Sequence, residues 1–266
     1  MFIPSALSMP ALFGNTLDPD TQAIASRMTT APSGDRLLLM NDLITGLKAS
    51  GVWDKLDALW VTAAADSQAA GLNWISSSYT LTPVNSPAFT VDRGYAGDGS
   101  TSYLNTGLSP LAAAKAVLNS SSVGVYINND PGASSSKIEI GAASTGQTLI
   151  GANDNGTSFR FRVNTGTTAF ASGLTGGLGL TSVSRTASNV TTPYRDGVAK
   201  NASNAASTAQ PEVPLFIGAA NASGSAALFS DRRIAASFIG QSLSDTEMAS
   251  LYSSLQTYLT NIGASA

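Results

Sequence analysis

The chain has 266 residues, of which 43% are hydrophobic and only 12% are charged, with a formal net charge of −3. This length and apolar content allow one large domain with an appendage, or two modest domains. The acidic balance speaks against a nucleic-acid partner, because phosphate binding needs clustered Lys and Arg. The sequence contains no Cys and no His, which excludes disulfides, thiolate or imidazole metal ligands, and Ser-His or Cys-His catalytic arrangements. No apolar run approaches the ~20 residues that span a bilayer, so we expect no membrane partner.

Residues 1–17 have neither helical nor strand periodicity, and we expect an extended N-terminal arm. Pro4 and Pro10 favour an extended path, and the arm lacks the basic start of a secretory signal. Packing of the arm on its own domain is one alternative. The other, which we prefer, is anchoring on a neighbouring subunit through five apolar residues: Phe2, Ile3, Leu7, Leu12 and Phe13.

Residues 18–71 carry helical patterns and predict a separate helical segment. Asp18 followed by Pro19 is a strong helix start. A second helix is predicted from Ser33 to Gly51, with one apolar face made of Leu37, Met40, Ile44 and Leu47. Helical spacing then predicts a short third helix that contains Trp53, Leu56 and Trp60.

From residue 72 to residue 266 the apolar period changes to two, in short runs separated by Gly, Pro, Asn and Asp. Many short alternating strands with frequent turn signals predict an antiparallel sandwich or barrel. Turns are expected at "NNDPG", "NDNG" and "YRDGV". Arg160 and Arg162 alternate with Phe159 and Phe161, so they should lie on the solvent face of their strand.

The chain ends with a predicted helix at residues 244–262. Ser244 and Glu247 form a capping box, and Gly263 is a natural stop. Helical spacing places one apolar stripe on Met248, Leu251, Tyr252, Leu255, Leu259 and Ile262. That stripe must lie against an apolar surface of the rest of the chain.

The order of these segments resembles the concanavalin A-like, laminin G-like jelly-roll family. The resemblance is carried by "GYAGDGSTSYLNTGL", "SSVGVYIN", "YRDGVAKN", "PLFIGAAN" and the final "RIAASFIGQSLSDTEMASLYSSLQTYL". It implies a mainly β jelly-roll sandwich whose closing helix lies across the edge or back of the sandwich. The run "MNDLITGLKASGVWDKLDALWVTAAADSQAAGLNW" is similar to a segment that precedes this jelly roll in phage and prophage proteins.

Glycosidase chemistry on this fold would need two closely placed carboxyl groups. The only glutamates are Glu139, Glu212 and Glu247. Glu139 has no acidic neighbour at the required spacing, Glu212 stands between prolines in a loop, and Glu247 serves as a helix cap, so we expect no enzymatic activity. Asp98 in "GDGS" and Asp154 in "NDNG" are candidate calcium ligands, although turn formation explains an aspartate at each position without an ion. We therefore expect no cofactor.

Two functions remain open from the sequence. The first is a non-enzymatic structural protein of a phage virion, displayed on the head or tail, with other virion proteins and copies of itself as partners. The second is a lectin-like module that binds host-surface glycans. Surface aromatic residues would be its stacking platforms, and the candidates are Tyr95, Tyr103, Tyr126, Tyr194 and the three tryptophans.

Overall fold

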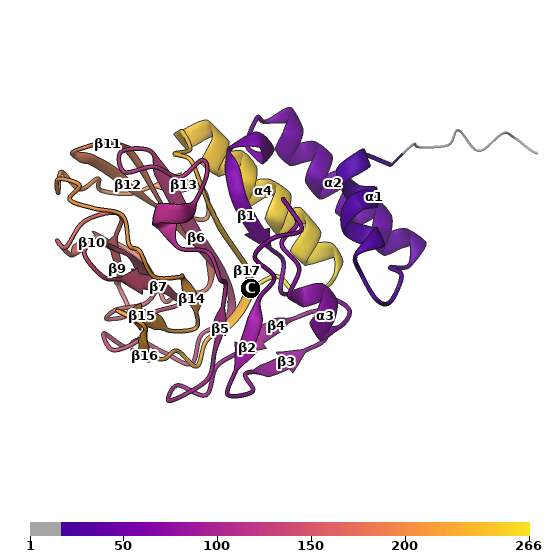
Figure 1. The fold of residues 1–266 in the computed structure, drawn as a ribbon, viewed down its shortest axis with the longest axis horizontal. Coiled ribbons are helices and arrows are strands. Elements are labelled where there is room, and N and C mark those ends of the chain that lie inside the picture. Colours follow the sequence, from indigo (N-terminus) through magenta and orange to yellow (C-terminus); the bar gives the residue numbers. More distant parts are fainter. Residues whose placement is uncertain (1–16) are drawn as a thin grey trace, which may run out of the picture.

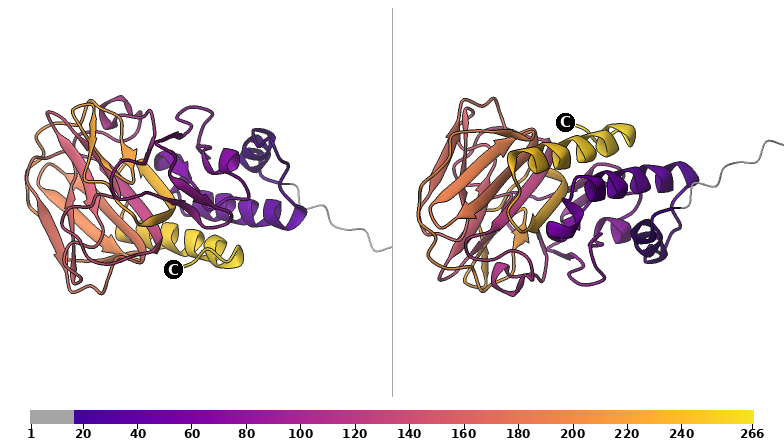
Figure 2. Two further views of the ribbon diagram at one scale, coloured as in Figure 1. Left: turned by 90° about the horizontal axis from the view of Figure 1, so that it is seen from below. Right: turned by 90° about the horizontal axis from the view of Figure 1, so that it is seen from above.

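Two β-sheets and a layer of helices make up residues 17–266, the part of the chain that the computed structural model describes (Figures 1 and 2). The helices are α1 (Pro19–Ser26), α2 (Gly34–Ala49), α3 (Ser67–Ala70) and α4 (Asp245–Asn261), with 3-10 turns at Trp53–Lys55 and Pro110–Ala112. The predicted arm residues Phe2, Ile3, Leu7, Leu12 and Phe13 lie outside the described residues. Within the described part, no helix is both long enough and apolar enough to cross a membrane.

The first sheet, sheet A, has eight strands in the order β13-β12-β11-β6-β17-β4-β3, and β1 pairs with β17 beside β4. Its strands are β1 (Leu56–Trp60), β3 (Ala88–Thr90), β4 (Gly94–Ala96), β6 (Ser121–Asn129), β11 (Gly179–Ala187), β12 (Val190–Arg195), β13 (Val198–Ala199) and β17 (Arg233–Gly240). All its pairings are antiparallel.

The second sheet, sheet B, has nine strands in the order β10-β9-β8-β7-β14-β5-β2, and β15 pairs with β7 and β16 off this path. Its strands are β2 (Thr82–Val84), β5 (Tyr103–Asn105), β7 (Ile140–Ala143), β8 (Gln147–Gly151), β9 (Ser158–Arg162), β10 (Ala169–Ser172), β14 (Phe216–Ile217), β15 (Ala220–Ala222) and β16 (Ser225–Ala227). Only the β15–β7 pair is parallel among the described strands. The two sheets therefore form the expected mainly antiparallel sandwich.

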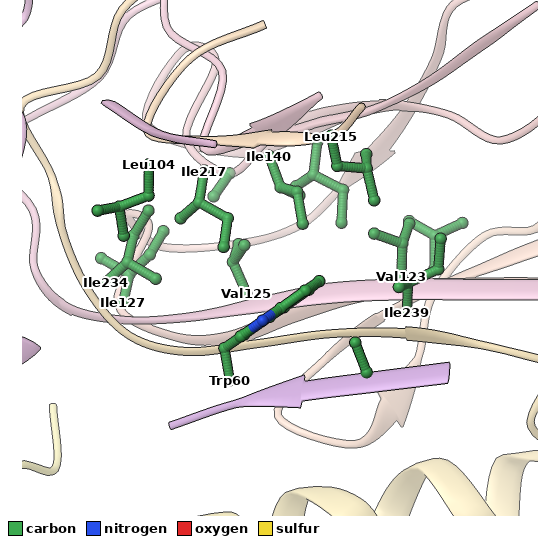
Figure 3. Packing of buried hydrophobic residues seen from close by; sticks show 14 of the residues in the cluster. Trp60, Leu104, Val123, Val125, Ile127, Ile140, Leu215, Ile217, Ile234 and Ile239 are labelled. Atoms are coloured by element: carbon green, nitrogen blue, oxygen red, sulfur yellow. The ribbon is translucent and has the colours of Figure 1, made fainter. Parts of the chain in front are cut away.

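The inner faces of the two sheets share one apolar cluster. Figure 3 shows Ile140 and Ile217 of sheet B facing Val125 and Trp60 of sheet A. These side chains are fully buried or nearly so. The alternation predicted for β9 is also confirmed, because Phe159 and Phe161 are buried while the intervening arginines are only half-buried.

The outer face of sheet A is also apolar, and helices α2 and α4 cover it (Figures 1 and 2). Tyr126, Leu180 and Phe238 of the sheet belong to the same buried cluster as Met40, Leu43, Ile44 and Leu47 of α2 and Met248, Leu251, Leu255 and Leu259 of α4. The start signals predicted from the sequence are confirmed: Asp18 caps α1, and Ser33 caps α2.

Helix α4 has the complete capping box expected from Ser244 and Glu247. Two tyrosines of sheet A hold it by hydrogen bonds: Tyr126 donates to Gln256 at 2.5 Å, and Tyr194 donates to Asp245 at 2.7 Å. The turn at Asp196 and Gly197 lies against the same helix, and both residues have positive φ, as a tight hairpin needs. A Cβ at Gly197 would meet the backbone of Ala249 at 2.9 Å.

The third helix predicted around Trp53, Leu56 and Trp60 was wrong. Trp53–Lys55 is a 3-10 turn, and Leu56–Trp60 is strand β1, buried along its whole length. This strand pairs with β17, so the segment 18–71 contributes to sheet A as well as to the helical layer. Asp57 anchors it, because its carboxylate accepts the backbone N–H groups of residues 114–116 at 2.8 Å each. A fully buried strand is apolar on both faces and carries no clear period of two.

In the last strand, Ile234, Ala236 and Phe238 have the period-two spacing that predicts one shared face, and this prediction was partly wrong. Strand β17 has register shifts after Arg233 and after Ile234. Ile234 therefore belongs to the cluster between the sheets, whereas Ala236 and Phe238 face the helices. A β-bulge inserts one residue and moves the following side chains to the opposite face.

Replacing Leu255 by Asp should lower the free energy of unfolding by roughly 3 kcal/mol or more, because Leu255 is fully buried between α4 and sheet A. Losing the apolar contacts alone costs about 2–5 kcal/mol, and burial of a charge adds to that. Chemical denaturation of both proteins measures the difference. The control is Ser253→Asp on the exposed side of the same helix, which should stay within about 0.5 kcal/mol of the parent. Equal effects of the two substitutions would contradict the docking of α4.

Candidate ligand pocket beside the helical layer

The three glutamates considered for catalysis lie in unrelated settings. Glu139 is fully buried, Glu212 is exposed, and Glu247 completes the cap of α4 and pairs with Lys55 at 2.6 Å. The structure brings no two of them into contact, and each has a structural partner of its own.

Glu139 belongs to a buried ion network centred on Arg232, whose side chain is also fully buried. The guanidinium donates to Glu139 at 2.7 Å and to Asp130 at 2.7 Å, and also to the backbone carbonyls of Gly132 and Asn153. Asp130 in turn accepts the N–H of Gly177 at 2.7 Å. The network thus fastens three loops at one end of the sandwich, and the guanidinium of Arg232 is fully occupied by partners from the chain itself.

The two aspartates considered for calcium have local partners instead. Asp98 accepts the backbone N–H groups of Ser100, Thr101 and Ser102, which hold the pKa of its carboxyl well below the usual range. Asp154 lies 3.7 Å from Arg160. Within residues 17–266, no group of three or more acidic side chains is placed to hold a metal ion.

Most aromatic residues proposed as stacking platforms are core residues. Buried side chains include Tyr95, Tyr126, Tyr194 and all three tryptophans. Tyr103 alone among these candidates is partly exposed, on the outer side of sheet B, and one face of its ring is stacked on Phe216 with centroids 4.3 Å apart. Trp74 differs from the other buried aromatic residues, because it lines an open pocket.

This Trp74 pocket has a volume of about 170 Å³ and lies where the start of α2, the segment around α3 and the last turns of α4 meet. It sits at the junction of the two apolar clusters: Ala64 and Ala69 belong to the cluster between the sheets, whereas Met40 and Tyr258 belong to the cluster under the helices. Met28 packs against both. The pocket is therefore a gap at the edge of the helical cover.

Polar groups in the pocket come from both helices and from the loop before α3. Arg36 forms an ion pair with Asp92 at 2.5 Å and donates to the hydroxyl of Tyr258 at 3.3 Å. Asp66 uses one carboxylate oxygen to cap α3. Ser33 and Thr30 add hydroxyl groups. Aromatic and apolar walls with a few polar groups are typical of small-molecule sites.

The indole N–H of Trp74 has no hydrogen-bond partner among the described residues, although the nitrogen is buried. Its ring packs edge-on against Tyr258, with centroids 5.7 Å apart. Most buried donors in folded proteins are satisfied, and an unsatisfied one costs about 1–3 kcal/mol. Trp74 also lines the adjacent pocket, so this unpaired donor belongs to a residue of the pocket wall.

Burial raises the pKa of the Tyr258 phenol, and Arg36 offsets this only in part. Burial alone would lower the pKa of Arg36, but Tyr258 and Asp92 outweigh it and raise the pKa. At neutral pH the pocket therefore presents a protonated phenol and a charged guanidinium.

Arg36, Asp66 and Tyr258 were not predicted from the sequence, and Trp74 was only one of several aromatic candidates. Trp74 lies close to Asp66 in the chain, but Arg36 and Tyr258 are 222 residues apart in the sequence. Only tertiary packing brings them together, and no local spacing could have indicated the site.

No protein-family profile and no curated protein sequence matches this chain. Trypanosoma rangeli sialidase is 12% identical over 84% of this chain and 39% of its own, with a TM-score of 0.53. The same sialidase in complex with sialic acid is 13% identical over equal shares, with a TM-score of 0.53. Domain 4 of AbnA, a GH43 extracellular arabinanase from Geobacillus stearothermophilus, in complex with arabinotriose, is 12% identical over 74% of this chain and 98% of its own, with a TM-score of 0.48.

The likeness is one of fold. This chain spans about two fifths of the sialidase length, and at such low identity the comparison supports the β-sandwich alone. The mainly β sandwich expected from the sequence is confirmed, whereas the resemblance to phage proteins stays a prediction.

Replacing Glu139 by Gln should lower the free energy of unfolding by about 3 kcal/mol. The change takes one of two carboxylates from the buried Arg232, and removing a partner from a buried ion pair typically costs 3–5 kcal/mol. Urea denaturation gives the value. Glu212→Gln, at an exposed glutamate, is the matched control and should change stability by less than about 0.5 kcal/mol. If the two substitutions had the same effect, the ion network would not have the structural role described.

Acid should destabilise the protein partly through Asp130. Burial opposes ionisation, but hydrogen bonds from Arg232 and Asn153 and the charge of Arg232 hold the pKa of this carboxyl below its usual value. A carboxyl with a lowered folded pKa stabilises the fold above its unfolded pKa of about 3.9, and the contribution disappears as the pH falls through the folded pKa. The unfolding free energy should therefore decrease below about pH 4, and less steeply in Asp130→Asn. If the unfolding free energy decreased with falling pH equally steeply in the parent and in Asp130→Asn, Asp130 would not contribute to the acid sensitivity.

Proposed function

We propose that this chain is a non-enzymatic carbohydrate-binding module and that the Trp74 pocket holds one sugar unit. The observation that carries the proposal is the pocket itself. It combines aromatic walls, a buried indole N–H without a partner among the described residues, and polar groups from Arg36 and Asp66. Sugars present both apolar C–H faces and hydroxyl groups, so a site with aromatic and polar sides suits them.

The comparisons support the proposal at the level of fold. One of the similar structures is a sialidase in complex with sialic acid, and its sandwich likeness extends over 84% of this chain. One fold can host many functions, so the pocket and not the fold carries the argument.

A binding role is proposed rather than catalysis for two reasons. Glycosidases generally use two carboxyl groups that flank the scissile bond, and Asp66 is the one carboxylate that lines the pocket. Some glycosidases use a tyrosine nucleophile, but the raised pKa of Tyr258 keeps its phenol protonated and suited to donate a hydrogen bond. No cofactor is proposed for this site.

Display on a phage particle, expected from the sequence resemblance, is compatible with glycan binding and remains a prediction. In that setting the sugar would belong to the host surface, and the N-terminal arm would provide attachment to other virion proteins or to further copies of this chain.

A glycan array with the purified chain tests the function, followed by calorimetry on each sugar that binds. We expect saturable binding that is lost in Ala65→Phe. Ala65 is exposed and lines the pocket, so a ring there fills the space without entering the core. The matched control, Ala222→Phe, is exposed on strand β15 and should bind like the parent.

Two outcomes would contradict the proposal. If the chain bound no glycan on the array, the proposed glycan-binding function would be wrong. Binding that survives Ala65→Phe but is lost in Tyr103→Ala would place the sugar on the outer face of sheet B instead of in the Trp74 pocket.

A further inference from the structure

We infer that the sugar bound in the Trp74 pocket is a neutral N-acetylated hexosamine, held through its acetamido group. This inference rests on the proposed glycan-binding function and narrows it to a ligand class. It comes from three properties of the pocket: its charge balance, its hydrogen-bond donors and its apolar wall.

The charge balance disfavours an acidic sugar. Arg36 is the one basic residue that lines the pocket, and its guanidinium is already paired with Asp92 at 2.5 Å. Asp66 is the one carboxylate that lines the pocket, and it has no basic partner among the lining residues. With the guanidinium of Arg36 already paired and the carboxylate of Asp66 at the wall, a ligand carboxylate would meet repulsion without a free cationic partner.

The hydrogen-bond donors of Trp74 and Tyr258 favour a ligand atom that can accept two hydrogen bonds. The indole N–H of Trp74 has no acceptor among the described residues. The hydroxyl of Tyr258 accepts from Arg36, which leaves its own hydrogen available for donation. A carbonyl oxygen can accept both hydrogens, and the acetamido carbonyl is the strongest neutral acceptor that common hexosamines carry.

The remaining two parts of an acetamido group also find complementary partners. Its N–H can donate to Asp66, because only one oxygen of that carboxylate is used to cap α3. Its methyl group matches the apolar wall formed by Met28, Met40 and Ala69. A hydroxyl in place of the acetamido group would leave this wall without apolar contact and would offer one group where the pocket has partners for three.

The test is a calorimetric series on the full chain with N-acetylglucosamine, glucose and N-acetylneuraminic acid. N-acetylglucosamine should bind at least about tenfold more tightly than glucose, since one missing methyl-sized group with its hydrogen bonds typically costs tenfold or more. N-acetylneuraminic acid carries the same acetamido group and, in addition, a carboxylate. It should bind more weakly than N-acetylglucosamine, because the pocket has no free cation for that carboxylate.

Two variants connect this preference to the pocket. Trp74→Phe keeps an aromatic ring but removes the N–H, and it should reduce the preference for N-acetylglucosamine over glucose to less than about threefold. Trp53→Phe is the matched control, because the Trp53 N–H already donates to Asp20 at 3.1 Å and lies outside the pocket. Asp66→Asn keeps a capping side chain for α3 but removes the carboxylate charge. It should therefore reduce the difference in affinity between N-acetylglucosamine and N-acetylneuraminic acid. Melting curves verify that each variant is folded.

The outcomes separate this inference from the proposed function. Equal affinity for glucose and N-acetylglucosamine would overturn the inference and leave a sugar-binding module. If N-acetylneuraminic acid bound more tightly than N-acetylglucosamine, the inferred preference for a neutral sugar would be wrong. If the preference for N-acetylglucosamine over glucose were lost in Trp53→Phe but kept in Trp74→Phe, the Trp74 pocket would not be the site that recognises the acetamido group. Absence of binding to any sugar, in this series and on the array, would overturn both the inference and the function.

Discussion

Sheet A is apolar on both of its faces, and this property governs how the rest of the chain is arranged. Strands β1, β6 and β17 are buried along nearly their whole length. Sheet B covers one face, and only a second apolar layer can cover the other. Helices α2 and α4 provide that layer, which explains why a β-sandwich ends with a long amphipathic helix (Figure 2). The Trp74 pocket lies where this second layer ends.

Arg232 and Arg36 both pair with carboxylates, but they differ in how far they are enclosed. Arg232 is enclosed by carboxylates and carbonyl oxygens, and it closes one end of the sandwich. The side chain of Arg36 remains 16% exposed and borders open space, although it also has a carboxylate partner. A fully enclosed charge of this kind stabilises or specifies a structure, whereas a partly open one can also contact a ligand. This difference favours the Trp74 pocket over the ion network as the functional site.

The sequence predicted those elements whose signals are local. The caps at Asp18, Ser33 and Ser244 and the alternation at Phe159 and Phe161 each depend on a few neighbouring residues, and the structure confirms them. Strand β1 was mistaken for a helix because a strand that is buried on both faces loses its alternation. The bulge in β17 changes the face of Phe238 without any signal in the residue pattern. The pocket could not be predicted, because Arg36 and Tyr258 meet only through the packing of α2 against α4.

The indole N–H groups of the three tryptophans allow a direct test of sugar binding in the Trp74 pocket. Trp53 donates its indole N–H to Asp20, Trp60 donates to the carbonyl of Tyr79 at 2.8 Å, and Trp74 has no acceptor among the described residues. Nuclear magnetic resonance of the nitrogen-15-labelled chain should therefore show three indole N–H signals, and Trp74→Phe assigns one of them. During titration with N-acetylglucosamine, we expect a saturable downfield shift of the Trp74 signal while the Trp53 and Trp60 signals stay in place. An unmoved Trp74 signal at a concentration where calorimetry shows binding would contradict the assignment of the sugar to this pocket.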